Sequence, residues 1–150
     1  MVQKKKQFKK TLYNSFINNF ILEGKKKTAK GIVDTALLTL SIGSNLSLVQ
    51  LLFKVYFNID YFIEIKQVVI KRRTYTVPFS IIYNRRIYLI IKKIKNAINL
   101  DKRKISLPEK LKFELYNILN LSSSSRALKM VKKNQSLVRS SRSNIHFRWK

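Results

Sequence analysis

The placement of acidic residues is the feature that most limits how this chain can fold. The chain has 7 Asp and Glu against 32 Lys and Arg, which gives a formal net charge of +25. No acid lies in residues 1–22, 65–100 or 115–150, and these segments carry five, nine and eight basic residues. A merely solvated surface would mix both signs. The segregation therefore predicts a continuous positive face, whose self-repulsion is relieved when a polyanion neutralises it.

The remaining composition excludes several classes of protein. Hydrophobic residues make up 45% of the chain, which is enough to build a core and argues against a disordered polycation. A length of 150 residues fits one ordinary domain. The absence of cysteine excludes disulfides, Cys-ligated metals and thiol nucleophiles. We expect neither a metal nor a cofactor.

Targeting and membrane signals are weak. The opening Met-Val-Gln-Lys-Lys-Lys has no secretory cleavage site and is not Ser- and Arg-rich like a transit peptide, so a protein that works in an organelle is expected to be made there. The most apolar stretch, residues 46–63, is interrupted by Gln50, Lys54, Asn58 and Asp60. Because charges inside a bilayer are costly, we expect no transmembrane helix and no membrane partner.

Apolar periodicity predicts a mainly α-helical fold, a bundle of about five to six helices. The isoleucines of residues 84–99 fall on one face, with Lys92, Lys93 and Lys95 largely outside. The bulky apolar residues of the central helices are expected in the core. Thr28 and Ser47 are the expected N-caps of two helices. Helices are predicted from Thr11 to Gly24, from Thr28 to Gly43, from Ser47 to Asn58, over 84–99, from Pro108 to Leu119 and over 126–139, with an irregular end to the chain.

A protruding β-hairpin is predicted over residues 62–79. Residues 63–66 alternate apolar and polar, which is the period of a strand, and Pro78 suits a strand end. Because two strands alone are marginal in water, the arm is expected to lean on the helical body or to stiffen on its ligand. The chain is thus read as one domain, 1–150: a basic arm over 1–10, a helical body over 11–121 that carries the hairpin, and a linker with a basic tail over 122–150.

Catalysis is poorly supported by the sequence. The single histidine, His146, lies in the basic tail with no carboxylate nearby in sequence, and the three glycines form no phosphate-binding loop. We therefore expect that the protein is not an enzyme.

Four clusters are typical of anion or base binding, and three of them have a plainer alternative. Residues 25–27 precede a helix start, which favours anions, although a solvated turn is the favoured interpretation of these residues alone. Arg72 and Arg73 at the hairpin tip can enter a groove or protect an exposed edge. Two arginines, residues 85–86, open a helix against the dipole preference and so predict an external partner. Trp149 either packs on the body or stacks on a base.

Short motifs are spread over almost the whole chain, in residues 16–18, 24–26, 29, 32–33, 36–37, 63–66, 74–78, 85–86, 142 and 146–149. In their order and spacing these motifs resemble the small-subunit ribosomal protein seven family of the bacterial type.

The resemblance implies a helical body with a protruding hairpin. It also implies a structural, non-catalytic role in translation: direct binding to the 3′ major domain of small-subunit ribosomal RNA and nucleation of head assembly. Implied neighbours are small-subunit ribosomal protein eleven, exit-site transfer RNA and messenger RNA. Taken with the charge pattern, the expected ribosomal RNA contacts are Lys25, Lys26, Lys27, Lys71, Arg72, Arg73, Tyr75, Arg85, Arg86, Lys92, Lys129, Arg142, His146, Arg148 and Trp149.

Departures from the family pattern suggest a divergent member. Where the family often has a paired glycine at the hairpin tip, this chain has residues 71–73, Lys-Arg-Arg, which leaves the turn type open. Tyr61 replaces a family proline before the first strand. These changes, with a composition typical of an AT-biased genome, favour a mitochondrial protein, and a plastid one as the second choice. Two rivals stay open: a non-ribosomal basic nucleic-acid-binding or architectural protein, and a peripheral membrane protein with a basic amphipathic helix.

Overall fold

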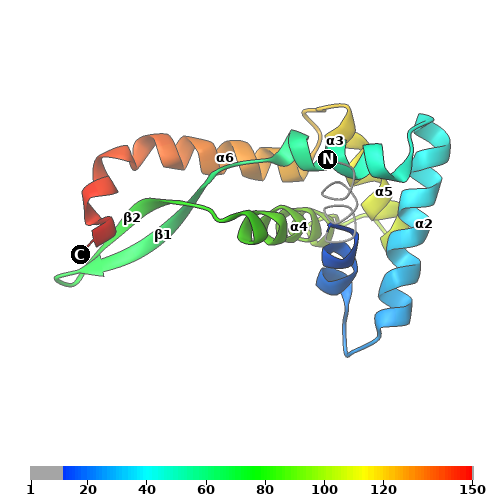
Figure 1. Ribbon diagram of the computed structural model, residues 1–150, viewed down its shortest axis with the longest axis horizontal. Helices are drawn as coiled ribbons and strands as arrows, with labels where there is room; N and C mark the ends of the chain where they lie inside the picture. Colours follow the sequence, from blue (N-terminus) through cyan, green and yellow to red (C-terminus); the bar gives the residue numbers. More distant parts are fainter. Residues whose placement is uncertain (1–11, 150) are drawn as a thin grey trace.

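The computed structural model describes residues 12–149, and it has a helical body from which a β-hairpin and a long helix extend in the same direction (Figure 1). This arrangement confirms the predicted mainly α-helical fold with a hairpin arm. The predicted basic arm, residues 1–10, lies outside the described residues. After a helix at residues 12–20 the elements are α2 Lys26–Ser44, α3 Leu48–Ile59, β1 Ile63–Ile70, β2 Arg73–Ser80, α4 Tyr83–Asn99, α5 Leu107–Leu119, α6 Arg126–Ser140 and the 3-10 helix η1 Arg142–Trp149.

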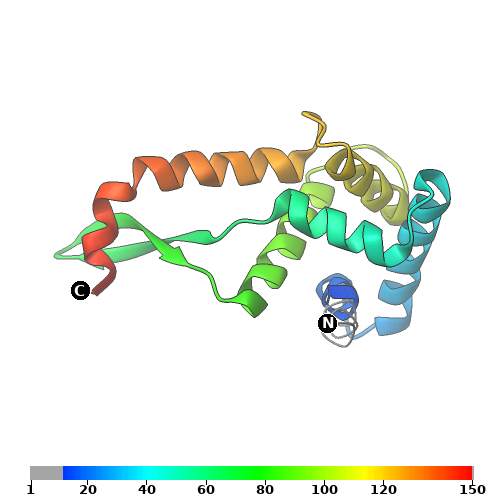
Figure 2. The same cartoon turned by 45° about the horizontal axis from the view of Figure 1, so that its top comes forward.

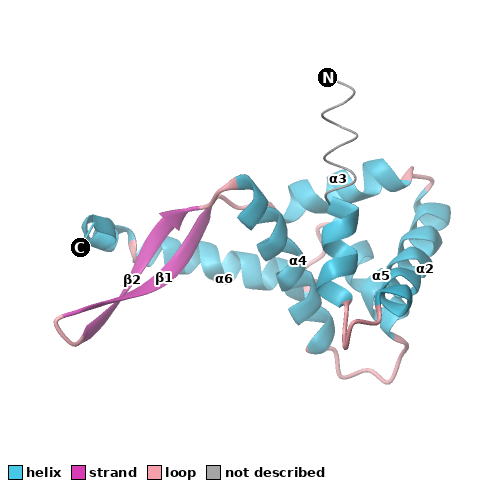
Figure 3. Ribbon diagram, turned by 60° about the horizontal axis from the view of Figure 1, so that its bottom comes forward, coloured by secondary structure: helices cyan, strands magenta, loops and turns pink. Residues whose placement is uncertain are grey.

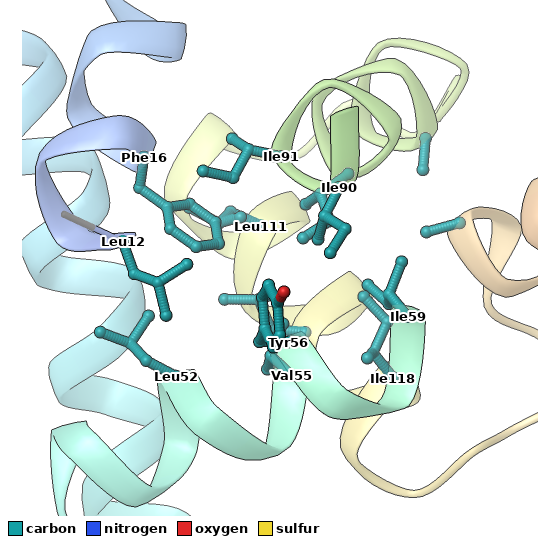
Figure 4. Close-up of a cluster of buried hydrophobic side chains, with 14 of the residues drawn as sticks. Leu12, Phe16, Leu52, Val55, Tyr56, Ile59, Ile90, Ile91, Leu111 and Ile118 are labelled. Carbon is teal, nitrogen blue, oxygen red and sulfur yellow. The ribbon is translucent and has the colours of Figure 1, made fainter. Parts of the chain in front are cut away.

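The core lies where the helices of the body converge on α5, which packs against α2, α3 and α4 (Figure 4). The predicted isoleucine face of α4 is buried, and Ile91 and Ile94 are fully inaccessible to solvent. Leu12 and Phe16 from the helix at residues 12–20 reach the same cluster. Spacings of three and four residues thus place one face of each helix in a shared apolar interior.

The structure confirms one of the two predicted N-caps and corrects the other. The Ser47 hydroxyl accepts the Gln50 N–H at 3.4 Å, and the Gln50 carboxamide oxygen accepts the Ser47 N–H at 3.1 Å, so the predicted cap of α3 is confirmed as a full capping box. The predicted cap at Thr28 is wrong. The α2 helix begins at Lys26, and the Thr28 hydroxyl donates to the Lys25 carbonyl oxygen at 2.7 Å inside the first turn.

The hairpin pairs Ile63 with Ser80 at its base and Ile70 with Arg73 at its tip. Only its base meets the body, where Glu64 pairs with Arg85 of α4, and the strands themselves do not lean on the body as expected. Helix α6 contacts β1, and η1 contacts β2, so the arm is supported by the tail (Figure 2). The irregular chain end predicted from the sequence is therefore wrong: residues 142–149 form η1, which lies beside the strands (Figure 3).

Two lysines of α4 are less exposed than predicted. Lys95 donates from Nζ to the Asn19 carbonyl oxygen at 2.5 Å, and Lys93 Nζ lies 3.9 Å from the centre of the Tyr61 ring. Both lie where other segments cover α4, which its own periodicity cannot reveal. On α3, Phe57 lies outside the core with 67% of its surface exposed, contrary to the expectation for the central helices.

None of the helices within residues 12–149 is by itself long and apolar enough to cross a bilayer. The pair α2 and α3 reaches that length and composition together, but the two helices are bent by 96° to one another.

Candidate nucleic-acid interface

The hairpin tip is a two-residue turn built from cations. Lys71 and Arg72 have φ angles of 46° and 68°, so both central residues adopt the left-handed backbone of a type I′ turn. Asn-Gly is favoured in such turns, because a side chain in this region costs about 1–2 kcal/mol per residue. The turn type that the sequence left open is thus a strained one that displays two long basic side chains. Strain of this kind is typical of functional sites.

The tip has no acidic partner among residues 12–149. Lys71, Arg72 and Arg73 are all exposed and take part in none of the five ion pairs of the described region. Glu64, the acid of the hairpin, lies at its base and pairs with Arg85. The distal half of the arm therefore carries positive charges only, and an external anion is needed to neutralise them.

The two arginines that open α4 have internal partners, which corrects the inference of an external one. Arg85 binds Glu64 through two hydrogen bonds of 2.8 and 3.3 Å, and Arg86 pairs with Asp60 at 3.2 Å. The Arg86 side chain is only 17% exposed and lies over the Phe62 ring. Both arginines fasten the base of the hairpin to α4. Arg85 keeps an exposed edge, whereas Arg86 does not face solvent as an RNA contact requires.

The tail places further candidate residues beside the hairpin. Arg148 donates from Nε to the Pro78 carbonyl oxygen at 2.6 Å, and the Tyr75 ring lies 4.6 Å from the Phe147 ring. Arg148 and Tyr75, which are both expected RNA contacts, are thus partly engaged inside the protein. Trp149 is 90% exposed, so it does not pack on the body and its ring is open to stacking. Arg142 and His146 are also exposed on η1.

The other candidates lie on separate elements. Lys25 pairs with Glu23 at 2.7 Å, and Lys26 and Lys27 are exposed at the start of α2. Helix α2 lies at the opposite end of the long axis from the hairpin (Figure 1). Lys92 on α4 and Lys129 on α6 are exposed as well. The fold therefore brings the tip and tail candidates together and leaves the three lysines of residues 25–27 apart from them.

The sequence reasoning missed three residues that shape this surface. Asn144 donates from Nδ2 to the Thr76 carbonyl oxygen at 3.0 Å, and Phe147 packs on Tyr75. The Phe79 ring is approached by Lys66 and Arg148 at 5.1 and 5.8 Å. Asn144 and Phe147 are three residues apart, which is one turn of a 3-10 helix. This spacing is the sequence signal that could have placed both residues on the same face of a helix.

The groups of the interface suit the binding of anions and bases. Within residues 12–149 no group of three or more His, Asp and Glu side chains could hold a metal ion. Asp101, the most strongly perturbed acid, lies away from the hairpin; hydrogen bonds from Arg103 hold the pKa of its carboxyl group well below the usual range. What the tip and tail offer is guanidinium and ammonium groups for phosphates and one open indole ring for a base.

Comparisons with known proteins point to one family. The family model described as ribosomal protein S7p/S5e matches residues 1–144. The small ribosomal subunit protein uS7 of Petrotoga mobilis is 30% identical over 141 residues, covering 92% of this chain and 87% of the relative. The uS7 protein of Erythrobacter litoralis is 28% identical, covering 95% and 90%. The uS7A protein of Aquifex aeolicus is 31% identical, covering 92% and 87%.

Proposed function

This chain belongs to the ribosomal protein S7p/S5e family, and from that premise we propose that its hairpin tip and tail bind small-subunit ribosomal RNA directly. As a small-subunit ribosomal protein it is a structural part of the translation machinery and not an enzyme. The observation that carries the proposal is the tip: three exposed cations, two of them on strained backbone, with no acidic partner within residues 12–149.

The binding mechanism is phosphate neutralisation with limited base contact. Each lysine or arginine that meets a phosphate releases condensed counterions, which supplies affinity that falls steeply with salt. Folded RNA is then recognised by its shape and by unstacked bases, and Trp149 is the residue placed to stack on one. Lys26, Lys27, Lys92, Lys129 and Arg142 extend the contact beyond the arm. Arg86 is excluded, because Asp60 and Phe62 already enclose it.

The finer assignment follows from the family resemblance. The RNA is the 3′ major domain of the small-subunit RNA, and binding there nucleates assembly of the subunit head. The protein then lies near small-subunit protein eleven, exit-site transfer RNA and the messenger path. The Lys-, Ile- and Asn-rich composition and the departures from the family pattern favour a mitochondrial ribosome, with a plastid ribosome as the alternative. Co-sedimentation of the tagged chain with small subunits from each purified organelle tests the location.

The test of direct RNA binding is the double variant Arg72→Glu with Arg73→Glu. Affinity for a transcript of the 3′ major domain is measured by filter binding across a series of salt concentrations. If the tip meets phosphates, the variant binds more weakly and the slope of log affinity against log salt becomes shallower, by about 0.7–0.9 for each phosphate that the tip no longer neutralises.

The matched control is Lys102→Glu with Lys104→Glu, which makes the same change of net charge on exposed residues of the α4–α5 loop. If only the overall charge mattered, the two variants would lose the same affinity for the transcript. The proposal of a tip contact fails if the tip variant keeps the wild-type affinity and slope, or if it is no weaker than the control.

A further inference from the structure

The hairpin is poorly supported by its own strands and by the helical body. It has two strands, and an isolated pair of strands is marginally stable in water. Its base is joined to α4 by the ion pairs of Arg85 with Glu64 and of Arg86 with Asp60. The Ile81 N–H donates to the Phe62 carbonyl oxygen at 3.0 Å and so joins the two segments of the base to each other. These links all lie at the base and leave the tip, eight strand residues away, without a contact to the body.

Helix α6 supports the arm only loosely near that base. A cavity of about 390 Å³ lies between the start of β1 and the second half of α6. Its lining residues are Asp60, Tyr61, Phe62, Ile63, Asn134, Gln135, Val138 and Arg139. This pocket, which opens to solvent, limits the contact between α6 and the base of the hairpin.

The 3-10 helix η1 makes the close contacts to the middle of strand β2. Asn144 and Arg148 donate to the carbonyl oxygens of Thr76 and Pro78, and Phe147 packs on Tyr75. Residues two apart on a strand point their carbonyl groups to the same edge, so η1 closes one edge of β2. The partners are 68 and 70 residues apart in sequence, so this contact locks the end of the chain onto the arm.

The length of η1 indicates that these contacts hold it in place. It spans eight residues, whereas 3-10 helices longer than three or four residues are uncommon because their hydrogen bonds are poorly aligned. None of its residues is buried, so a local core does not explain it. The anchors along β2 are what stabilise the helix, and the helix in turn restrains β2.

The other end of the tail is fixed to the body. Glu114 of α5 accepts hydrogen bonds from the Ser125 hydroxyl at 2.7 Å and from the Ala127 N–H at 2.9 Å, and Arg126 pairs with Asp101 at 3.3 Å. The start of α6 is thus held by two buried carboxylates. Body, α6, η1 and β2 form a closed circuit, in which the hairpin is held at its base by α4 and further out by η1 (Figure 2).

From this circuit we propose that η1 is a brace that sets the direction of the hairpin tip, with Asn144 and Phe147 as its positioning residues. The inference rests on the proposed RNA binding by the tip. A braced arm presents the three tip cations in one arrangement before RNA arrives, so less conformational freedom is lost on binding. If the brace is released, the competent arrangement is only a fraction of the population, and the apparent affinity falls by that fraction.

The test is the double variant Asn144→Ala with Phe147→Ala, which removes two anchors without changing charge. In the RNA-free protein, hydrogen exchange of the backbone amides of residues 66–77 is expected to become about tenfold faster, because local opening is easier. Affinity for the 3′ major domain transcript is expected to fall about threefold, as when the competent state drops to a third of the population. The salt slope should stay unchanged, because the same phosphates are contacted once the arm is in place.

The control is Ser143→Ala with Ile145→Ala, which alters the same helix at two exposed side chains and is expected to leave both exchange and affinity as in wild type. Circular dichroism melting checks that the helical body stays folded. The brace is refuted if the hairpin amides exchange no faster in the double variant. Its role in RNA binding is refuted if exchange quickens while affinity holds, or if the salt slope falls. The exchange measurement needs no RNA, so it still tests the brace if the wild-type chain fails to bind the transcript and the proposed function itself is lost.

Discussion

Lys93 shows how one residue can oppose the fold that contains it. Its ammonium group is buried without a hydrogen-bond partner among residues 12–149, and burial lowers its pKa from 10.5 to about 8. The face of the Tyr61 ring, 3.9 Å away, compensates only in part for the lost hydration. The neighbouring Lys92 is exposed. Placing a cation in this position therefore penalises the folded state.

Replacing Lys93 with Met should raise the melting temperature at neutral pH. In the wild type, the unfolded chain binds more protons than the folded chain between pH 8 and 10.5, so this group's contribution to stability rises with pH across that window and its penalty is complete below it. The advantage of the variant should thus be largest at neutral pH and shrink toward pH 9.5, as followed by calorimetry at about pH 7, 8 and 9.5. Lys92→Met removes the same charge from an exposed site and serves as the control. An equal effect of the two variants would show that net charge, not burial, is responsible.

At the scale of the element, α6 depends on a carboxylate from another helix. Its N-cap, Ser125, is completely buried, and its hydroxyl accepts the Leu128 N–H at 3.2 Å. Glu114 satisfies both the Ser125 hydroxyl and the Ala127 N–H. A negative charge at a helix N-terminus is favourable, and here it also joins α5 to α6. The direction of the whole tail follows from this joint.

The variant Glu114→Ala should destabilise the protein by about 1–3 kcal/mol, because it leaves two buried donors without an acceptor. Urea denaturation followed by circular dichroism measures the change. Glu109→Ala, on the exposed first turn of the same helix, is the comparison and should cost about 0.3–1 kcal/mol through the helix dipole. Equal losses in both variants would argue that the buried hydrogen bonds contribute nothing beyond charge.

For the whole molecule, charge and folding are in conflict. Four of the seven acids are engaged internally: Asp60, Glu64, Asp101 and Glu114 fasten the hairpin base and α6. Most of the 32 basic residues therefore repel one another across the surface. This distribution suits a protein whose native surroundings are ribosomal RNA.

Added salt should consequently stabilise the isolated protein. Raising NaCl from about 0.05 to 0.5 M shortens the screening length well below the typical spacing of surface charges and weakens their repulsion. The melting temperature is expected to rise by several degrees in scanning calorimetry. The Arg72→Glu, Arg73→Glu variant has a lower net charge and should respond less. A melting temperature that falls with salt would mean that the internal ion pairs, rather than the uncompensated cations, dominate the electrostatics.

Much of the fold could be predicted because its signals are local. The three- and four-residue apolar spacings define the helices, Ser47 with Gln50 defines the start of α3, and the alternation near Ile63 defines the hairpin. The prediction of Thr28 as the N-cap of α2 was wrong because the helix begins two residues earlier, after a backbone turn at Gly24, which has a φ of 72°. The family motifs likewise run along the chain in order, so they too were accessible from the sequence.

What the sequence determined by itself was the identity of the elements, the segregation of charge and the class of partner, because these depend on neighbouring residues or on sums over the chain. Only the tertiary structure decided which cations remain available. Arg86 meets Asp60 across 26 residues, Lys93 meets the Tyr61 ring, and Arg148 meets Pro78 across 70 residues. Contacts between residues so far apart in sequence leave no periodic pattern in it, because they depend on how the elements pack against one another.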